Sequence, residues 1–383
     1  MRVLFTTTGH SGHLLPLVPL ARACERAGHE VLVATHEPRA DNVERLGLPV
    51  RGIAVSPDEA WAPLMGRLPG LRQAEGDALI IGEGFARIGA GGALPGFLEA
   101  VEQWRPDVLV HECYEFAGPI AAERHGVRLA RVALGLASTE DWVSELAASA
   151  VADLRAGVGL GPEPGPATML LSLLPPGLDD GPAERFRDGS PPAPRPLPAW
   201  WSDADAPLVY VTLGSVTGSL PPFYPGLFRA VLEALAPLAV RVLLTIGRDA
   251  DPAALGTLPA NAHAEPWVSQ HDVLPHAAAV VSHAGHGTTL GALQHGVAHA
   301  MLPLFAGDQW RTARRVADLG AGALLEEGER RVFDAPEPSV VAALAGAVGR
   351  ALDDASMTAV ARGLGEEIAA LPAADAAAAA LAA

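Results

Sequence analysis

Short apolar runs alternate with amphipathic stretches along the whole chain. In the first half the apolar runs are rich in leucine and β-branched residues, as β-strands are. They are RVLFTTT (2–8), EVLVAT (30–35), DVLVH (107–111) and RLARVAL (128–134). Helical patterns such as LLPLVPLARACERAG (14–28) and GPIAAERHG (118–126) lie between them. This alternation predicts an α/β fold whose parallel sheets are covered by helices on both faces.

The same alternation begins again after a proline-rich segment, GSPPAPRPLPAWW (189–201). Its strand-like runs are PLVYVTLGS (207–215), RVLLTIG (241–247), AAAVVSHAG (277–285) and HAMLPLFAG (299–307). Because proline lacks an N–H and has a fixed φ, the segment between the halves is expected to be a semi-rigid linker. The predicted organisation is a first α/β domain over 1–188, the linker over 189–203, a second α/β domain over 204–365, and a C-terminal helix over 366–383 that packs back on the first domain.

Two Rossmann-like domains joined in this way would leave a cleft between them. Open parallel sheets bind ligands beyond the carboxyl ends of their strands. Both sets of strand ends are therefore expected to face the cleft.

Composition excludes several classes of partner. The 383 residues carry 44 acidic and 27 basic side chains, a net charge of −17 that argues against nucleic acid or an anionic membrane. The sequence contains no run of about 18 apolar residues, the length needed to span a bilayer, and its N-terminus lacks a secretory signal pattern. Two cysteines, Cys24 and Cys113, are expected to be buried thiols in a reducing cytoplasm. The sequence leaves open whether the protein forms a homodimer.

The stretch SHAGHGTTLGALQHG (282–296) follows a strand-like run and has the pattern of a phosphate-binding turn. Its glycine spacing matches neither the dinucleotide fingerprint nor the Walker sequence. Gly285 and Gly287 allow close backbone approach, while Thr288 and Thr289 add hydroxyl donors at the start of a helix. Free N–H groups at that helix end would bind an anion of phosphate size. The alternative is a glycine-rich helix start without a ligand.

Three motifs in order carry a resemblance to a known family. They occur in EPWVSQHDVLPHAAAVVSHAGHGTTLGAL (265–293) and LPLFAGDQWRTARRV (302–316). These segments resemble the Trp-x-Pro-Gln, His-x-Gly-x-Gly-Thr and Asp-Gln motifs of nucleotide-sugar glycosyltransferases of the two-domain GT-B fold. The chain is most similar to the bacterial branch that decorates antibiotics and other natural products, over essentially its whole length.

The resemblance implies a donor site in the second domain and an acceptor site in the first. Trp267 would stack on the base, the Val268 backbone would contact the base edge, and Gln270 would contact the nucleoside. The residues implied to bind the diphosphate are Gly214 and Ser215 in the first loop and His283, Gly285, Gly287 and Thr288 in the glycine-rich turn. Asp308 and Gln309 are implied to bind the sugar hydroxyls. Asp308 with Gln309 is alternatively a helix N-cap and its neighbour.

Three departures from the family pattern bear on the donor. Ser269 replaces the usual proline, and Thr312 stands where many members carry asparagine. Gly291 replaces a glutamate that bonds the ribose hydroxyls in many UDP-sugar enzymes. A lost hydrogen bond to a charged group is worth about 1.5–3 kcal/mol, which favours deoxyribose and hence a dTDP-sugar. Gln294 could compensate, so a UDP-sugar donor stays open.

A histidine and a carboxylate form the implied catalytic pair. The family's GH-x-x-P element matches Gly12, His13 and Pro16, which makes His13 the general base for the acceptor hydroxyl. A helix N-terminus would keep its imidazole neutral. Glu112 stands where the family has aspartate and is one methylene longer, so either the backbone is set back or the contact to His13 is looser. The fallback carboxylate is Glu115, expected at the surface, and the runner-up base is His10, which could instead shape the acceptor pocket.

The implied reaction is an inverting displacement that needs no metal and no cofactor, with the helix donors neutralising the diphosphate. The D-x-D sequences at 203–205 and 249–251 are interpreted as turns. Residues 56–95 and 135–160 are interpreted as irregular apolar loops that line a pocket for a bulky aglycone. Trp61, Met65, Phe85 and Trp142 are its candidate lining residues. Open alternatives are C-glycosylation, a nucleotide-sugar 2-epimerase, and a non-catalytic sugar-nucleotide-binding subunit.

Overall fold

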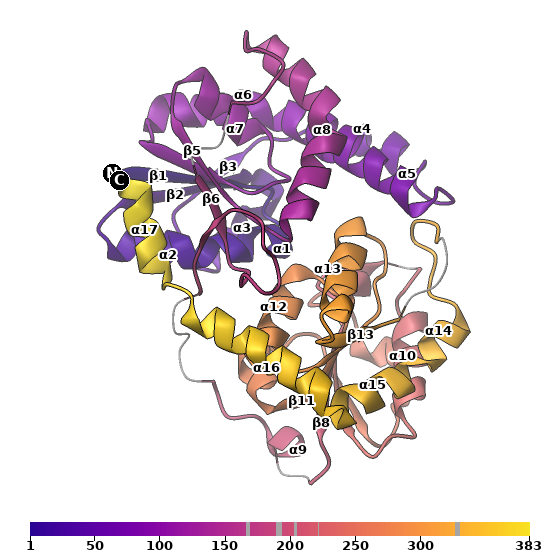
Figure 1. The fold of residues 1–383 in the computed structure, drawn as a ribbon. Coiled ribbons are helices and arrows are strands. Elements are labelled where there is room, and N and C mark those ends of the chain that lie inside the picture. Colours follow the sequence, from indigo (N-terminus) through magenta and orange to yellow (C-terminus); the bar gives the residue numbers. More distant parts are fainter. Residues whose placement is uncertain (166–168, 189–193, 203–204, 221, 326–329) are drawn as a thin grey trace. The chain divides into compact units, whose positions relative to one another are not determined.

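A computed structural model describes residues 1–165, 169–188, 194–202, 205–220, 222–325 and 330–383 (Figure 1). The chain divides into two compact units. The first contains residues 1–189 and 371–383, and the second contains residues 190–370. Each unit is built on a parallel β-sheet with helices packed against it, which confirms the predicted α/β fold.

The sheet of the first unit has the strand order β3-β2-β1-β4-β5-β6-β7, and all neighbouring strands are parallel. The strands are β1 Arg2–Thr7, β2 Glu30–His36, β3 Val50–Ile53, β4 Val108–His111, β5 Arg128–Val132, β6 Met169–Ser172 and β7 Glu184–Arg185. The order reverses between β1 and β4. At such a switch point the loops after two neighbouring strands diverge, and open α/β sheets bind ligands there.

The helices of the first unit fill the crossovers between these strands. They are α1 Ser11–Leu14, η1 Leu15–Leu17, α2 Val18–Arg26, η2 Glu37–Arg39, α3 Ala40–Glu44, α4 Asp58–Met65, α5 Gln73–Ala78, η3 Leu79–Ala90, α6 Gly91–Trp104, α7 Ala117–Arg124 and α8 Ala137–Gly157. The last helix of the chain, α17 Ala374–Ala382, packs on α2 and buries Ala374, Ala377, Ala378 and Leu381 (Figure 1). Its alanine-rich sequence suits this close helix contact.

The interpretation of residues 56–95 and 135–160 as irregular loops is wrong. Most of these residues lie in α4, α5, η3, the start of α6, and α8, and η3 packs along α8. A Cβ at Gly82 would lie 2.9 Å from the carbonyl oxygen of Leu146, so the glycine lets the two helices approach. Glycine lowers local helix propensity, and here tertiary packing outweighs that preference.

The sheet of the second unit has the order β10-β9-β8-β11-β12-β13 and is also parallel. Its strands are β8 Leu208–Thr212, β9 Arg241–Thr245, β10 Ala262–Glu265, β11 Ala277–Ser282, β12 His299–Met301 and β13 Gly322–Leu324. Its helices are α9 Ala199–Ser202, η4 Thr217–Ser219, α10 Gly226–Leu235, η5 Pro252–Leu255, α11 Gln270–Val273, η6 Leu274–His276, α12 His286–Gln294, α13 Gly307–Asp318, α14 Pro338–Ala342, α15 Leu344–Asp353 and α16 Ala355–Ala370. None of the helices in the described part of the chain is long and apolar enough to cross a membrane.

Candidate active site

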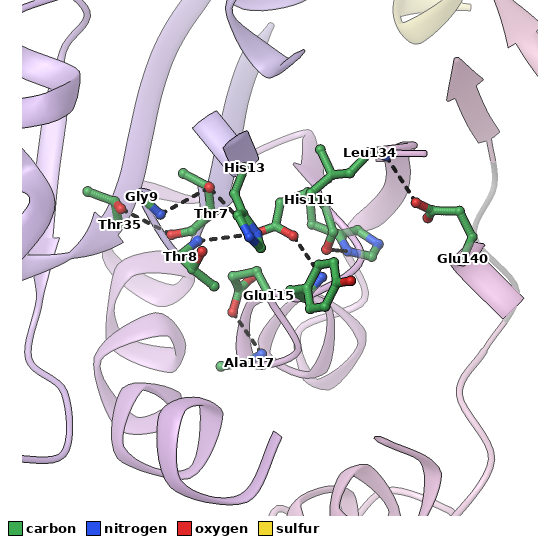
Figure 2. Close-up of polar contacts among 12 residues, drawn as sticks. Thr7, Thr8, Gly9, His13, Thr35, His111, Glu115, Ala117, Leu134 and Glu140 are labelled. Atoms are coloured by element: carbon green, nitrogen blue, oxygen red, sulfur yellow. Dashed lines mark hydrogen bonds and ion pairs between the residues drawn. The ribbon is translucent and has the colours of Figure 1, made fainter. Parts of the chain in front are cut away.

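His13 lies just beyond the end of β1 (Figure 2), and Glu112 directly follows β4; these are the two strands at the switch point. The Nδ1 atom of His13 is 3.2 Å from the Oε1 atom of Glu112. This distance suits an ion pair, although the ring is turned away from a linear hydrogen bond. The His13 side chain is 18 % exposed and the Glu112 side chain is fully buried. The extra methylene of glutamate thus does not prevent contact with the imidazole.

Backbone N–H groups hold the Glu112 carboxylate in place. Oε1 accepts from the N–H of Thr8 at 3.1 Å, and Oε2 accepts from the N–H of Tyr114 at 2.7 Å. Burial opposes the charged form, but the neighbouring His13 and these donors outweigh it and lower the pKa of the Glu112 carboxyl. A carboxylate fixed in this way can orient an imidazole and stabilise it once protonated.

Aromatic rings surround the imidazole of His13. The Tyr114 ring lies edge-on at 4.9 Å between centroids, and the Phe85 ring is stacked at 6.0 Å. The ring of His10 lies 5.9 Å away between centroids. Burial, with the nearby charge of Arg39, lowers the pKa of His10 to about 3, so His10 is neutral at physiological pH. The sequence analysis did not identify Tyr114, because nothing in its local pattern marks a ring that packs on the candidate base.

Glu115 is buried, which contradicts its expected place at the surface. Its Oε1 accepts from the N–H groups of Ala117 at 2.8 Å and Gly118 at 3.0 Å, at the start of α7. Burial raises the pKa of this carboxyl to about 7. Its carboxylate is thus engaged by a helix start, while Glu112 is the carboxylate that contacts His13.

The other candidate acceptor residues occupy the helices that follow β3 and β5. The indole of Trp61 in α4 lies against η3 and would be within 3.1 Å of a Cβ at Gly84. Met65 is 43 % exposed at the end of α4. Trp142 in α8 packs against the core of the first unit. Among these candidates, the rings of Phe85 and His10 contact the ring of His13.

In the second unit, the glycine-rich turn lies between β11 and α12, as the sequence predicts. Gly285 is the N-cap of α12. A Cβ at Gly285 would lie 2.4 Å from the Nε2 atom of His283, and one at Gly214 would lie 2.8 Å from the same atom. The imidazole therefore fits between two glycines, one in each loop. Burial lowers the pKa of His283 to about 4, so it is a neutral hydrogen-bonding group.

A buried hydrogen bond supports this turn from inside the unit. The hydroxyl of Ser282 accepts from the N–H of Ala284 at 2.9 Å and is 2.9 Å from Nε2 of His299. Ala284 has a φ of +63°, a conformation that few non-glycine residues adopt. The sequence analysis missed Ser282 and His299, whose proximity depends on the pairing of β11 with β12.

The first turn of α12 is linked to α11 by a side-chain bond. Nε2 of Gln270 donates to the hydroxyl of Thr288 at 2.9 Å. A Cβ at Gly291 would lie 2.9 Å from Cδ1 of Leu274 and 3.8 Å from Oε1 of Gln270. The side chain of Leu274 therefore fills the space that a longer residue at Gly291 would need.

The indole of Trp267, the candidate base platform, is 47 % exposed, while Val268 is half-buried against the core. The guanidinium of Arg248 lies 3.8 Å from its ring centroid. This cation–π contact covers one face of the indole. Arg248 carries no motif and was not identified from the sequence.

Asp308 and Gln309 lie in the first turn of α13, so the N-cap alternative for Asp308 is wrong. The N-cap is Ala306, two residues earlier. Oε1 of Gln309 accepts from the N–H groups of Leu304 at 2.8 Å and Phe305 at 3.3 Å. Gln309 thus fixes the loop after β12 as well as standing beside Asp308.

Within the described residues, no group of three or more histidine, cysteine or acidic side chains could hold a metal ion. The first D-x-D sequence at 203–205 falls mostly outside the described residues. In the second, Asp251 accepts from the N–H of Ala253 at 2.9 Å and caps η5, as expected for a turn. Both Cys24 and Cys113 are buried free thiols.

Comparisons with known proteins agree with this architecture. Residues 79–154 match the N-terminal domain, and residues 229–383 the C-terminal domain, of erythromycin biosynthesis protein CIII-like. L-demethylnoviosyl transferase of Streptomyces niveus is 32 % identical over 343 residues, which cover 85 % of each chain.

Two solved structures resemble the whole chain. The glycosyltransferase SsfS6 of Streptomyces sp. SF2575, complexed with thymidine diphosphate, is 26 % identical with a TM-score of 0.79, over 100 % of this chain and 99 % of that one. The spinosyn rhamnosyltransferase SpnG, complexed with spinosyn aglycone, is 25 % identical with a TM-score of 0.81, over 100 % of both chains.

Two parallel-sheet α/β units and these relatives define a glycosyltransferase of the GT-B fold, which confirms the predicted class. The chain belongs to the erythromycin biosynthesis protein CIII-like family of bacterial natural-product glycosyltransferases.

Proposed function

We propose that the protein transfers a deoxysugar from a dTDP-sugar to a hydroxyl of a bulky natural-product aglycone, with inversion at the anomeric carbon. The contact between His13 and Glu112 carries the proposal, because it keeps the carboxylate 3.2 Å from Nδ1 and leaves Nε2 for the acceptor. Nε2 takes the hydroxyl proton while the oxygen attacks the anomeric carbon. The bond from that carbon to the phosphate oxygen breaks, and dTDP leaves with the electron pair.

The start of α12 is the proposed site for the leaving diphosphate. N–H groups at Gly285 to Thr288 and the neutral imidazole of His283 are hydrogen-bond donors at the positive end of the helix. These donors would offset the charge that develops on the leaving phosphate oxygen. The proposed reaction therefore requires no metal.

Two observations favour dTDP as the nucleotide. Gly291 supplies no carboxylate for a ribose 2′-hydroxyl, and Leu274 occupies the space beside it. SsfS6 was solved with thymidine diphosphate, and a further relative is TDP-daunosamine transferase DnrS of Streptomyces peucetius, 28 % identical over 371 residues. A UDP-sugar donor is the second candidate, since Oε1 of Gln270 lies near Gly291 and could accept from a 2′-hydroxyl.

The test is a transfer assay with dTDP-sugars and UDP-sugars against a panel of aglycones. We expect product with dTDP-sugars, an inverted anomeric configuration by NMR coupling, and unchanged rates in EDTA. His13→Gln should lower turnover by about 10²–10⁴-fold, the usual contribution of a general base. Wild-type turnover in His13→Gln, or equal affinities for dTDP and UDP by calorimetry, would contradict the corresponding part of the proposal.

A further inference from the structure

Three polar side chains at the same end of the first sheet as the candidate base make no hydrogen bond or ion pair with any described residue. They are His10, His36 and Arg39, here called the Arg39 cluster. Each is partly buried. His36 ends β2 and Arg39 ends η2, while His10 lies in the loop after β1. All three therefore lie at the carboxyl ends of adjacent strands, the edge at which His13 also lies.

The backbone holds Arg39 in this position. Gly9 has a φ of +81°, and a Cβ there would lie 2.8 Å from Cβ of Arg39 and 2.4 Å from the hydroxyl of Thr35. The stem of Arg39 therefore packs directly on the loop that leads to His10. The side chain of Asn42 fixes the same loop, because its Nδ2 donates to the carbonyl of Gly9 at 2.9 Å.

The positive charge of Arg39 lacks a counter-ion in the described structure. Burial lowers the pKa of its guanidinium, which means that the surroundings disfavour the charge. Glu112 is engaged by His13 and by backbone N–H groups, and Glu37 is exposed. A partly buried guanidinium without a carboxylate partner is a place where a ligand anion would be favourable.

The two imidazoles of the cluster add neutral hydrogen-bonding groups. Burial, with the charge of Arg39 contributing, lowers the pKa of His10 to about 3, and burial lowers that of His36 to about 4. A neutral imidazole offers one N–H donor and one acceptor nitrogen. A ligand bound here would therefore meet one fixed positive charge and N–H donors on the same side.

We propose that the Arg39 cluster binds an ionised oxygen of the acceptor, a carboxylate or an acidic phenol or enol, next to the hydroxyl that reacts. The proposal rests on the proposed function, in which His13 deprotonates that hydroxyl. A guanidinium binds the two oxygens of a carboxylate, or of an ionised hydroxy-carbonyl group, with paired hydrogen bonds. The same cation favours the acceptor oxygen as an anion and so assists its deprotonation. The acceptor class is thus an acidic hydroxy-aromatic or hydroxy-enol compound.

The test uses 1-hydroxy-2-naphthoate and its methyl ester as probes of the full-length protein, with binding measured by calorimetry. The wild-type protein should bind the acid at least tenfold more tightly than the ester. Arg39→Gln should abolish that difference and leave the ester affinity within twofold. Arg39→Lys, which keeps the charge but not the paired donors, should retain part of the preference for the acid.

Arg51→Gln is the matched control, since it removes the same charge from β3, where Arg51 pairs with Glu99 at 3.3 Å. It should keep the wild-type preference. Equal acid and ester affinities in the wild-type protein, an acid preference that survives in Arg39→Gln, or displacement of the acid by millimolar inorganic phosphate would overturn the proposal.

The affinity for dTDP, measured in the same variants, separates this proposal from the proposed function. It should be the same in Arg39→Gln and wild type, because the cluster lies in the first unit. If Arg39→Gln loses its affinity for dTDP as well as for the probe, the variant is unfolded, and its melting temperature checks this. The acid preference of Arg39→Lys then decides the outcome. Absent sugar transfer would contradict the proposed function while leaving the probe result intact.

Discussion

The carboxylate of Glu112 contacts Nδ1 of His13 at 3.2 Å although a glutamate stands where the resemblance to known glycosyltransferases implies an aspartate. The N–H group of Thr8 donates to Oε1 of the longer side chain and that of Tyr114 donates to Oε2, so both carboxylate oxygens are held in place. The position of the carboxylate, rather than the identity of the residue, is what the imidazole requires.

Two substitutions at this position separate charge from length. Glu112→Gln removes the charge and should lower kcat by about 10²-fold, because the protonated imidazole loses its partner. Glu112→Asp keeps the charge but draws it back by one methylene, so its kcat should fall between those of wild type and Glu112→Gln. Steady-state kinetics measure both, with dTDP affinity in the second unit as the control. A kcat within twofold of wild type for Glu112→Gln would show that the contact has no catalytic role.

The position of His283 between two glycines gives a second prediction. Gly285 has φ −62° and ψ 143°, which alanine adopts without strain, so the effect of Gly285→Ala comes from its Cβ meeting Nε2 of His283. We expect the Kd for dTDP to rise about tenfold, which corresponds to about 1.4 kcal/mol.

A double-mutant cycle tests the cause of that loss. In a His283→Ala background the added methyl group meets no imidazole, so Gly285→Ala should change the Kd for dTDP by less than twofold. Calorimetry on the four proteins gives the coupling. Additive effects of the two substitutions would mean that the methyl group acts on the ligand or the backbone instead.

The fold was largely predictable because local sequence determines its main features. The buried strands β1, β2, β4 and β8 appear in the sequence as short apolar runs, and the helices between them show clear periodicity. The chain also carries its glycine-rich turn at the predicted junction of strand and helix. Helix η3 was missed because its three glycines weaken the helix signal, and its stability comes from packing against α8. Helix α8 has one glycine, at its last residue, so this reason does not apply to it.

The candidate site was predictable in part, for a related reason. His13 and Glu112 follow strand ends and belong to motifs, so their residue types and positions marked them. Tyr114 and Arg248 belong to no motif, and their contacts depend on loop conformation. Glu115 was expected at the surface because a lone charged residue usually is. Its burial depends on N–H groups at the start of α7, which only the folded chain brings to it.

The contact between Arg248 and Trp267 gives a third prediction. If the base stacks on the indole, Trp267→Ala should raise the Kd for dTDP about tenfold or more, since base–aromatic stacking is worth about 1–3 kcal/mol. Arg248→Ala should raise it about two- to fivefold, because an exposed cation–π contact contributes about 0.5–1 kcal/mol to the position of the ring. Calorimetric titration with dTDP measures both. Tighter binding by Arg248→Ala would show that the guanidinium covers the face that the base needs.

The buried carboxyl of Glu115 gives a prediction on stability and pH. Burial raises its pKa to about 7, above its ordinary value of 4.5, so the folded protein holds this proton at pH values where the unfolded chain has lost it. The free energy of unfolding therefore includes a contribution that is full below pH 4.5 and is lost as the pH rises through 7. For such a shift the loss is about 3 kcal/mol. Glu115→Gln has no proton to lose, so its stability relative to wild type should rise by up to that amount between pH 5 and pH 8.

Urea unfolding of both proteins at the two pH values measures the change. The difference between them isolates Glu115, because buried histidines such as His111 and His283, with pKa values lowered to about 4, titrate alike in both. Glu145→Gln, on an exposed position of α8, is the matched control and should follow the wild-type pH dependence. A constant difference in unfolding free energy between wild type and Glu115→Gln across this range would show that Glu115 is ionised in the folded protein throughout, with the N–H groups of Ala117 and Gly118 outweighing its burial.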